Sequence, residues 1–107
     1  TEEENYDEYE EYSEYMDGTY VGSGYGYHGG LTTVAVTIEN GQIVDIETIE
    51  ENDQPHHGQD YYSSAFNLIY PDILYYQSAD VDAVSGATYS SRGIIDAVSD
   101  ALSQARR

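Results

Sequence analysis

The chain has 107 residues, enough for one domain, and carries 21 acidic residues against three arginines and no lysine, a formal charge of −18. This charge repels nucleic-acid phosphates and anionic membrane surfaces, so we expect neither as a partner. The absence of cysteine excludes disulfides and thiolate sites. No segment approaches the roughly 18–20 consecutive apolar residues of a membrane helix, so we expect no membrane insertion.

Residues 1–16 form an acidic N-terminal arm in which Tyr6, Tyr9, Tyr12 and Tyr15 recur at every third position. Blocks of like charge are usually solvated tails. Tyrosine, in contrast, is favoured at interfaces because it combines apolar area with a polar tip. We expect the arm to pack on its own domain or on a neighbouring subunit and to build a homo-oligomer or a filament.

Residues 17–107 are expected to form the domain. Its first segment interleaves tyrosines with glycines, which is typical of a strand that is bent or bulged at Gly22, Gly24 and Gly26. Residues 33–38 then alternate between apolar and polar side chains, which predicts a half-buried strand.

Asn40-Gly41 predicts a type I′ hairpin turn, because both central positions of that turn need a positive φ. Val44 and Ile46 continue the buried row across the hairpin, and Ile49 suggests a change of face near the strand end. Three antiparallel strands in sequence order are therefore the expected sheet.

The second half of the chain is expected to be mostly helical. A helical region near residues 65–74 should break at Pro71 or begin a second short helix there. A last amphipathic helix should start at about Ser90, since its apolar residues recur at steps of three and four. The predicted fold class is α+β: a curved antiparallel sheet of about three or more strands, helices on one side and an amphipathic C-terminal helix.

The most informative stretch is Asp82-Ala83-Val84-Ser85-Gly86-Ala87-Thr88, which places a hydroxyl just before a helix N-terminus. An anionic group on that hydroxyl would be favoured by unpaired N–H groups and the helix dipole. The structural alternative for Thr88 is an ordinary N-cap, with Ser90 and Ser91 also available for capping. Arg92 is the only cation before the C-terminal pair of arginines, and either pairs with such an anion or is a solvent-exposed helix residue.

The stretch Asp-x-x-Ser-Gly-Ala-Thr resembles the flavinylation motif of FMN-binding domains, such as those in the sodium-pumping NADH:quinone oxidoreductase and in secreted electron-transfer proteins. The resemblance extends to three further segments in the same order: Asp17–Gly26 is similar to the family's opening strand, Thr33–Ile46 to its hairpin and Gly93–Leu102 to its closing helix.

The resemblance implies that a flavin transferase takes FMN from FAD and esterifies its phosphate to Thr88. It also implies a motif role for Asp82 and Ser85, and Gly86 and Ala87 would leave room for the phosphate and the transferase. The expected function is that of a redox carrier rather than a stand-alone enzyme, passing electrons between donor and acceptor proteins or small acceptors. Because a tether prevents loss of FMN by dilution, we expect an extracellular or cell-surface location with the export signal removed.

Two other interpretations are kept beside this one. The chain could be a self-assembling structural or filament subunit, which is compatible with flavin binding, or a module that binds flavin without a covalent bond. The segment Asp53-Gln54-Pro55-His56 departs from the turn that similar domains place near the flavin ring, so the ring environment is the least transferable part of the resemblance. His56-His57 is interpreted as a pair of surface-loop histidines rather than a metal site.

Overall fold

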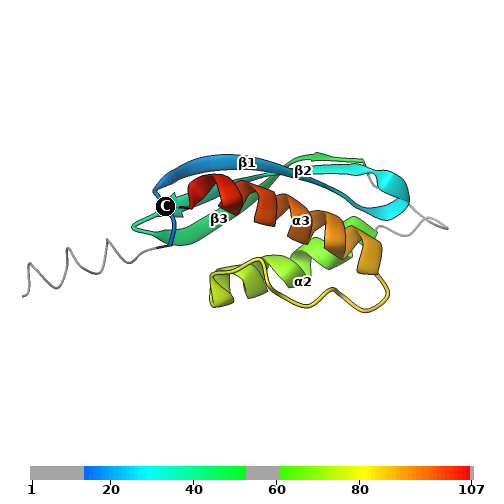
Figure 1. Cartoon of the computed structure of the whole chain (residues 1–107). Helices are drawn as coiled ribbons and strands as arrows, with labels where there is room; N and C mark the ends of the chain where they lie inside the picture. The colour runs from blue at the N-terminus through cyan, green and yellow to red at the C-terminus, as the bar shows by residue number, and fades with distance from the viewer. Residues whose placement is uncertain (1–13, 53–60, 107) are drawn as a thin grey trace, which may run out of the picture.

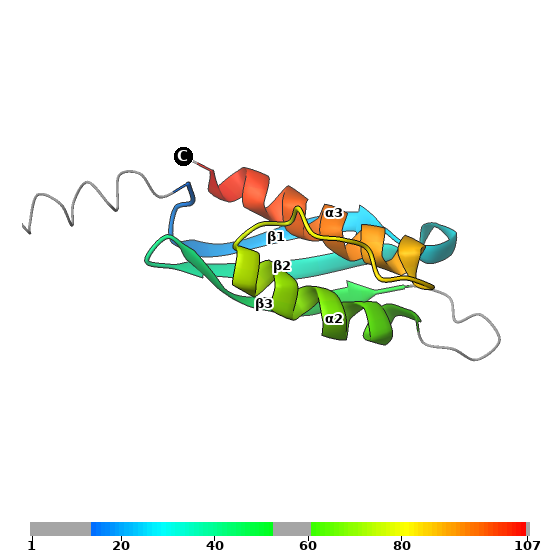
Figure 2. The same cartoon turned by 90° about the horizontal axis from the view of Figure 1, so that it is seen from below.

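The computed structural model describes residues 14–52 and 61–106. The elements in chain order are strand β1 (Gly18–Tyr25), the 3-10 turn η1 (Tyr27–Gly29), strands β2 (Leu31–Glu39) and β3 (Gln42–Glu51), and helices α2 (Tyr61–Tyr76) and α3 (Thr88–Ala105). The strands form one antiparallel sheet in the order β1-β2-β3, and both helices lie on the same face of it (Figures 1 and 2). The predicted α+β class and the closing helix are confirmed.

The hairpin between β2 and β3 follows from its two central residues. Asn40 has φ 53° and Gly41 has φ 76°, as a type I′ turn requires. The Asp17 carboxylate accepts hydrogen bonds from the backbone N–H groups of Asn40, at 2.9 Å, and Gly41, at 2.8 Å. The hairpin prediction is confirmed, and Asp17 in addition ties the turn to the start of β1.

The pairing of β2 with β3 shifts register at two points. Ile49 lies at one shift with an exposed side chain, which confirms the expected change of face. Val44 lies at the other and is also exposed, whereas Ile43 and Ile46 are buried. The prediction that Val44 continues the buried row was wrong, because the extra residue of a bulge turns its side chain away from the core.

Strand β1 lies against α3 at backbone contact. A Cβ atom on Gly22 would be 2.2 Å from the Ala97 carbonyl oxygen and 2.3 Å from the Ala101 nitrogen. One on Gly24 would be 2.6 Å from the Gly93 carbonyl oxygen. The strand was expected to be bent or bulged, and its pairing with β2 has no register shift, so the bulge is excluded. These glycines instead allow the helix backbone to approach the strand.

Side chains of α3 also cover the outer edge of β1. The Asp100 carboxylate accepts a hydrogen bond from the Ser23 N–H at 3.0 Å, and the Gln104 amide donates to the Val21 carbonyl at 2.7 Å. An uncovered strand edge invites pairing with another chain. The two contacts therefore protect β1 and hold α3 in register along it.

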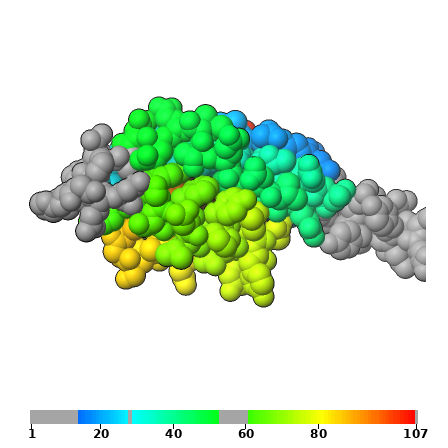
Figure 3. Space-filling view, turned by 180° about the vertical axis from the view of Figure 1, so that it is seen from behind, coloured from blue at the N-terminus to red at the C-terminus, as the bar shows by residue number. Residues whose placement is uncertain are grey.

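Helix α2 packs on the sheet through larger side chains and lies along β3 (Figure 3). Tyr62, Ile69 and Ile73 are among its buried residues. Pro71 lies inside this single helix, so the predicted break was wrong. Because Pro71 and Asn67 are both exposed, the carbonyl that loses its helical hydrogen bond is on the solvent side, where water can bind it.

Tyr15, the last tyrosine of the arm, is only 5% exposed and belongs to the hydrophobic core. It forms a β-bridge with Arg106, whose guanidinium carbon is 5.9 Å from the centroid of the Tyr15 ring. Next to it, the Met16 N–H donates to the Ala105 carbonyl at 2.8 Å, and Arg106 pairs with Glu14 at 2.8 Å. Tyr15 is thus docked on its own domain. The other three tyrosines of the arm lie outside the described residues, and a domain boundary after residue 16 stays a prediction.

Candidate functional site

The motif ends in a tight turn, Val84–Ala87, that leads directly into α3. The Ala87 N–H donates to the Val84 carbonyl at 3.0 Å, and Gly86 has φ +85°, as at the third position of a type II turn. A Cβ atom on Gly86 would meet no atom within 4 Å. The backbone conformation therefore favours glycine here, whereas the expectation that Gly86 leaves room for the phosphate and the transferase stays a prediction.

Ser91, one turn into α3, holds both ends of this turn. Its hydroxyl accepts a hydrogen bond from the Val84 N–H at 2.9 Å and donates to the Ala87 carbonyl at 2.7 Å. The Ser91 side chain is fully buried. Sequence reasoning considered Ser91 only as a possible cap, because a contact seven residues back along the chain is visible only once the loop is closed.

Thr88 is the first residue of α3, two residues earlier than the predicted start. Ala87 occupies the N-cap position with no side-chain capping bond, so the alternative role of Thr88 as N-cap is wrong. The Thr88 side chain is exposed, and its hydroxyl has no hydrogen bond to any residue that the structure describes. A free hydroxyl therefore stands at the helix N-terminus, where the first N–H groups have no intrahelical partner.

A hollow of about 240 Å³ opens beside Thr88, lined by Tyr27, Tyr61, Gly86, Ala87, Thr88, Tyr89 and Ser90. The Tyr27 ring lies near both other tyrosine rings, with its centroid 5.9 Å from that of Tyr61 and 6.1 Å from that of Tyr89. Sequence reasoning missed these three tyrosines, since they come from η1, α2 and α3 and meet only in the folded chain. A concave site with aromatic walls suits a planar ligand.

The side chains of the other predicted site residues make no hydrogen bond or ion pair with the described part of the chain. Asp82 and Ser85 are exposed and make no hydrogen bond to a described residue, so Asp82 does not close the loop. Arg92 is exposed and forms no ion pair within the described chain. It lies four residues after Thr88, a spacing that places the two side chains on the same helix face.

Among residues 14–52 and 61–106, no three His, Cys, Asp or Glu side chains are placed to hold a metal ion together. His56 and His57 lie outside these ranges. In the same part of the chain, neither helix is long and apolar enough to span a bilayer.

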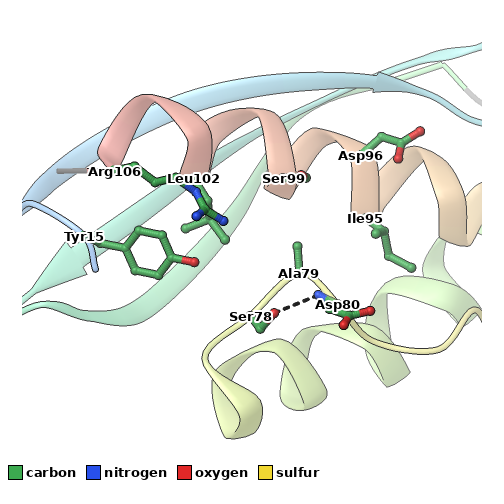
Figure 4. A pocket seen from close by; sticks show the side chains of 9 residues that line it. All are labelled: Tyr15, Ser78, Ala79, Asp80, Ile95, Asp96, Ser99, Leu102 and Arg106. Carbon is green, nitrogen blue, oxygen red and sulfur yellow. Dashed lines mark hydrogen bonds between the residues drawn. The ribbon is translucent and has the colours of Figure 1, made fainter. Parts of the chain in front are cut away.

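A second hollow, also of about 240 Å³, lies between α3 and the loop that follows α2 (Figure 4). Tyr15 and Arg106 lie at one end and Asp80 and Asp96 at the other. The Asp80 N–H donates to the Ser78 hydroxyl at 3.0 Å in its wall. Neither the five predicted residues of the motif nor Arg92 lines this hollow, so the candidate site is the one beside Thr88.

Known proteins of similar sequence match most of the chain. The profile of the FMN-binding domain family covers residues 26–103. Over 85 residues, or 79% of the chain, the sequence is 35% identical to the NADH:acrylate oxidoreductase of Vibrio harveyi, of which this is 8%. Over 88 residues, or 82% of the chain, it is 38% identical to an uncharacterized protein of Treponema pallidum (strain Nichols), of which this is 23%. The chain thus matches less than a quarter of either relative.

Proposed function

Because this chain belongs to the FMN-binding domain family, we propose that it is an electron carrier whose FMN is esterified through its phosphate to Thr88. FMN supplies the reversible uptake of one or two electrons, and the protein supplies attachment, orientation and charge. The observation that carries the proposal is the position of Thr88: an exposed, unbonded hydroxyl at a helix N-terminus beside a tyrosine-lined hollow.

The surroundings of Thr88 suit a phosphodiester. The ester keeps one negative charge, which the N-terminus of α3 stabilises by about 0.3–1 kcal/mol. Arg92, one helical turn further along the same face, is placed to pair with that charge. These contributions explain the location of the phosphate, whereas its retention comes from the covalent bond.

The tyrosine-lined hollow suits the flavin ring. Tyr27, Tyr61 and Tyr89 present aromatic surface to it, and Tyr89 is 63% exposed. The hollow is smaller than the roughly 300–1,000 Å³ of pockets that enclose a drug-sized ligand. We therefore infer that the tyrosines cover part of the ring and leave the rest open to a redox partner.

The attachment reaction balances with FAD as the donor. The Thr88 oxygen bonds to the phosphorus of the FMN half, the pyrophosphate bond breaks, AMP leaves, and the hydroxyl proton is released. We propose a flavin transferase as the partner for this step, since the described residues that line the hollow with Thr88 include no carboxylate and no imidazole. The chain itself is thus a substrate during maturation and a carrier afterwards.

Mass measurement tests the attachment. The wild-type chain, produced with a flavin transferase, should exceed its polypeptide mass under denaturing conditions by one FMN less water. Thr88→Ala should fold and carry no covalent flavin, and Thr88→Ser should retain part of it. Thr19→Ala, at an exposed threonine of β1, should be fully modified. Full incorporation into Thr88→Ala would overturn the assignment, and release of all colour on acid precipitation would favour non-covalent binding.

We also propose an extracellular or cell-surface location and assembly through the arm. Since Tyr15 is docked on its own domain, a contact with a second subunit depends on Tyr6, Tyr9 and Tyr12, which lie outside the described residues. Self-repulsion opposes assembly, so salt should strengthen it. Deleting residues 1–13 should abolish assembly in light scattering, and equal assembly of both chains would contradict an arm-mediated contact.

A further inference from the structure

Both described arginines have a role that leaves neither of them to face a partner at Thr88. Arg106 pairs with Glu14 at 2.8 Å, at the C-terminal end of α3. Arg92 lies one helical turn after Thr88 on the same face, where it is placed to pair with the phosphodiester. Within the described part of the chain, no further Lys or Arg offsets the acidic side chains near the flavin.

Two acidic side chains at this end of the molecule are exposed. Asp96 lies eight residues after Thr88 on the same face of α3, about 12 Å further along the helix. Glu50 lies near the end of β3 and pairs with Thr33, two residues after the start of β2; the turn η1 before β2 carries Tyr27 of the hollow. Neither carboxylate forms an ion pair with a described residue, so both keep their negative charge facing solvent.

Aromatic surface is exposed at the same end. Tyr89 follows Thr88 directly and is 63% exposed, although its ring lies 6.1 Å from that of Tyr27. In the proposed function the hollow covers only part of the flavin ring, so the uncovered part extends this surface. Protein interfaces commonly place aromatic side chains at their centre and polar ones around it. This end therefore has the composition of a docking surface with an acidic rim.

We propose that the redox partner of the flavin is a protein with a basic face, which docks on this end with Tyr89 at the centre and Asp96 and Glu50 at the rim. The inference rests on the proposed function of Thr88. Complementary charge raises the encounter rate by about 10- to 10³-fold at low salt. A partner with an acidic face is instead repelled by the chain's charge of −18.

Electron transfer in the docked complex balances with a one-electron acceptor. Each encounter moves one electron from the reduced flavin to the oxidised centre of the partner. Two encounters return the flavin to its oxidised form, and two protons pass to water.

Cytochrome c is the probe for this test, because it is a basic haem protein whose ferric iron accepts one electron. Succinylated cytochrome c keeps the haem but carries carboxylates in place of lysine ammonium groups, and is the matched control. The flavin-loaded chain is reduced, freed of excess reductant and mixed with either form in a stopped-flow instrument. At an ionic strength of about 10 mM, where the Debye length is about 30 Å, the second-order rate constant should be about tenfold higher or more with the basic form. At about 1 M salt the difference should largely disappear.

Charge reversals locate the docking surface. At about 0.1 M salt the Debye length is about 10 Å, so mainly the charges near the contact should act. Asp96→Lys and Glu50→Lys should each lower the rate constant with cytochrome c by about threefold. Glu39→Lys changes the net charge equally, but Glu39 is exposed at the hairpin end of β2, about 27 Å along the strand from Leu31. This control should react at the wild-type rate.

Docking can also be measured without the flavin. In the isotope-labelled, unmodified chain, cytochrome c should shift the amide signals of Tyr89, Asp96 and Glu50 in NMR spectra and leave that of Glu39 unchanged. Equal rates with both forms of cytochrome c at low salt, or equal slowing by Asp96→Lys and Glu39→Lys, would overturn this inference and leave the function of Thr88 standing. Absence of covalent flavin from the wild-type chain would overturn the proposed function, and the amide shifts would still decide whether a basic protein docks on this end.

Discussion

Helices α3 and α2 cover the same face of one sheet, but their buried side chains differ in size. The buried residues of α3 are mostly small: Ser90, Ser91, Gly93, Ile94, Ala97, Val98, Ala101, Leu102 and Ala105. Those of α2 are Tyr62, Ala65, Ile69 and Ile73. Small residues bring the α3 backbone into contact with β1 at Gly22, whereas α2 rests on long side chains and leaves Leu68, Tyr75 and Tyr76 between 59% and 80% exposed.

This difference indicates which of the two helices is held more rigidly against the sheet. A helix in backbone contact with a strand cannot slide without a steric clash, because interiors are close-packed. A helix that rests on flexible side chains can move by small amounts as these side chains adjust. Thr88 begins the first kind of helix, so the proposed attachment residue stands on the more tightly held of the two.

Gly22→Ala tests the backbone contact between β1 and α3 and should have the largest effect on stability. Its Cβ atom would lie 2.2 Å from a backbone oxygen of α3, and backbone atoms cannot turn aside as a side chain can. We expect the change to remove most of the unfolding free energy, which for a small domain is about 5–15 kcal/mol. Val21→Ala, at the adjacent half-exposed residue, should cost little. Urea denaturation followed by circular dichroism measures both, and similar stability of the two variants would contradict the tight contact.

Ile73→Ala probes the other helix. Ile73 is fully buried beneath α2, so truncation should cost about 2–5 kcal/mol of unfolding free energy. Leu68→Ala, on the exposed side of the same helix, should change it by less than about 0.5 kcal/mol. Native-state hydrogen exchange should show protection lost in α2 before α3. Equal loss of protection in both helices would mean that they are held equally tightly.

Thr32→Val should stabilise the domain. The Thr32 hydroxyl is fully buried on the inner face of β2, opposite Gly24, and has no hydrogen-bond partner among the described residues. Replacing it with a methyl group should raise the unfolding free energy by about 1–3 kcal/mol. Thr33→Val is the matched control, because the Thr33 hydroxyl is bonded to Ser23 at 3.0 Å on the open face. A destabilised Thr32→Val would show that this hydroxyl has a partner after all.

The smallest effect is expected at the C-terminal end of α3, where Tyr15 docks. Burial raises the pKa of the Tyr15 hydroxyl above 10.0, the Glu14 carboxylate raises it further, and Arg106 partly offsets this. The stabilisation linked to this proton is complete below pH 10 and is lost as the pH rises through the folded-state pKa. Tyr15→Phe should therefore reduce the alkaline fall in stability, by at most about 1.4 kcal/mol per pH unit. Burial and the Asp45 carboxylate raise the pKa of Tyr70 too, so part of the fall should remain.

Thermal melts between pH 9 and 12 measure this slope. Tyr75→Phe, at a side chain that is 80% exposed, is the control and should leave the slope unchanged. An identical alkaline slope in wild-type and Tyr15→Phe would show that folding does not raise the pKa of the Tyr15 hydroxyl.

The strands and their hairpin could be predicted from short sequence patterns, because each depends on residues that are close together in the chain. Asn40 and Gly41 need positive φ values that few other residue pairs adopt, and the alternation before them needs only the neighbouring strand. The errors arose where the deciding contact is distant in sequence. Gly22 was interpreted as a bend or bulge because nothing in β1 reveals that α3 packs on it. Pro71 was interpreted as a break or the start of a second helix because its exposure depends on how α2 packs.

The same distinction between local and distant contacts applies to the candidate site. Thr88 and the motif around it could be identified from seven consecutive residues together with three further segments that resemble the family in the same order. The tyrosine-lined hollow could not, since Tyr27, Tyr61 and Tyr89 come from three elements that meet only after folding. Ser91 was visible as a serine near a helix start, but its hydrogen bond to Val84 depends on the closed turn.

The β-bridge between Tyr15 and Arg106 and the candidate site at Thr88 lie at opposite ends of the same helix. The bridge lies at the C-terminal end of α3, and Thr88 is at the N-terminal end, so 18 residues of helix place them about 26 Å from each other. The last residues of the arm therefore join the domain at the C-terminal end of α3, away from Thr88 and the hollow beside it.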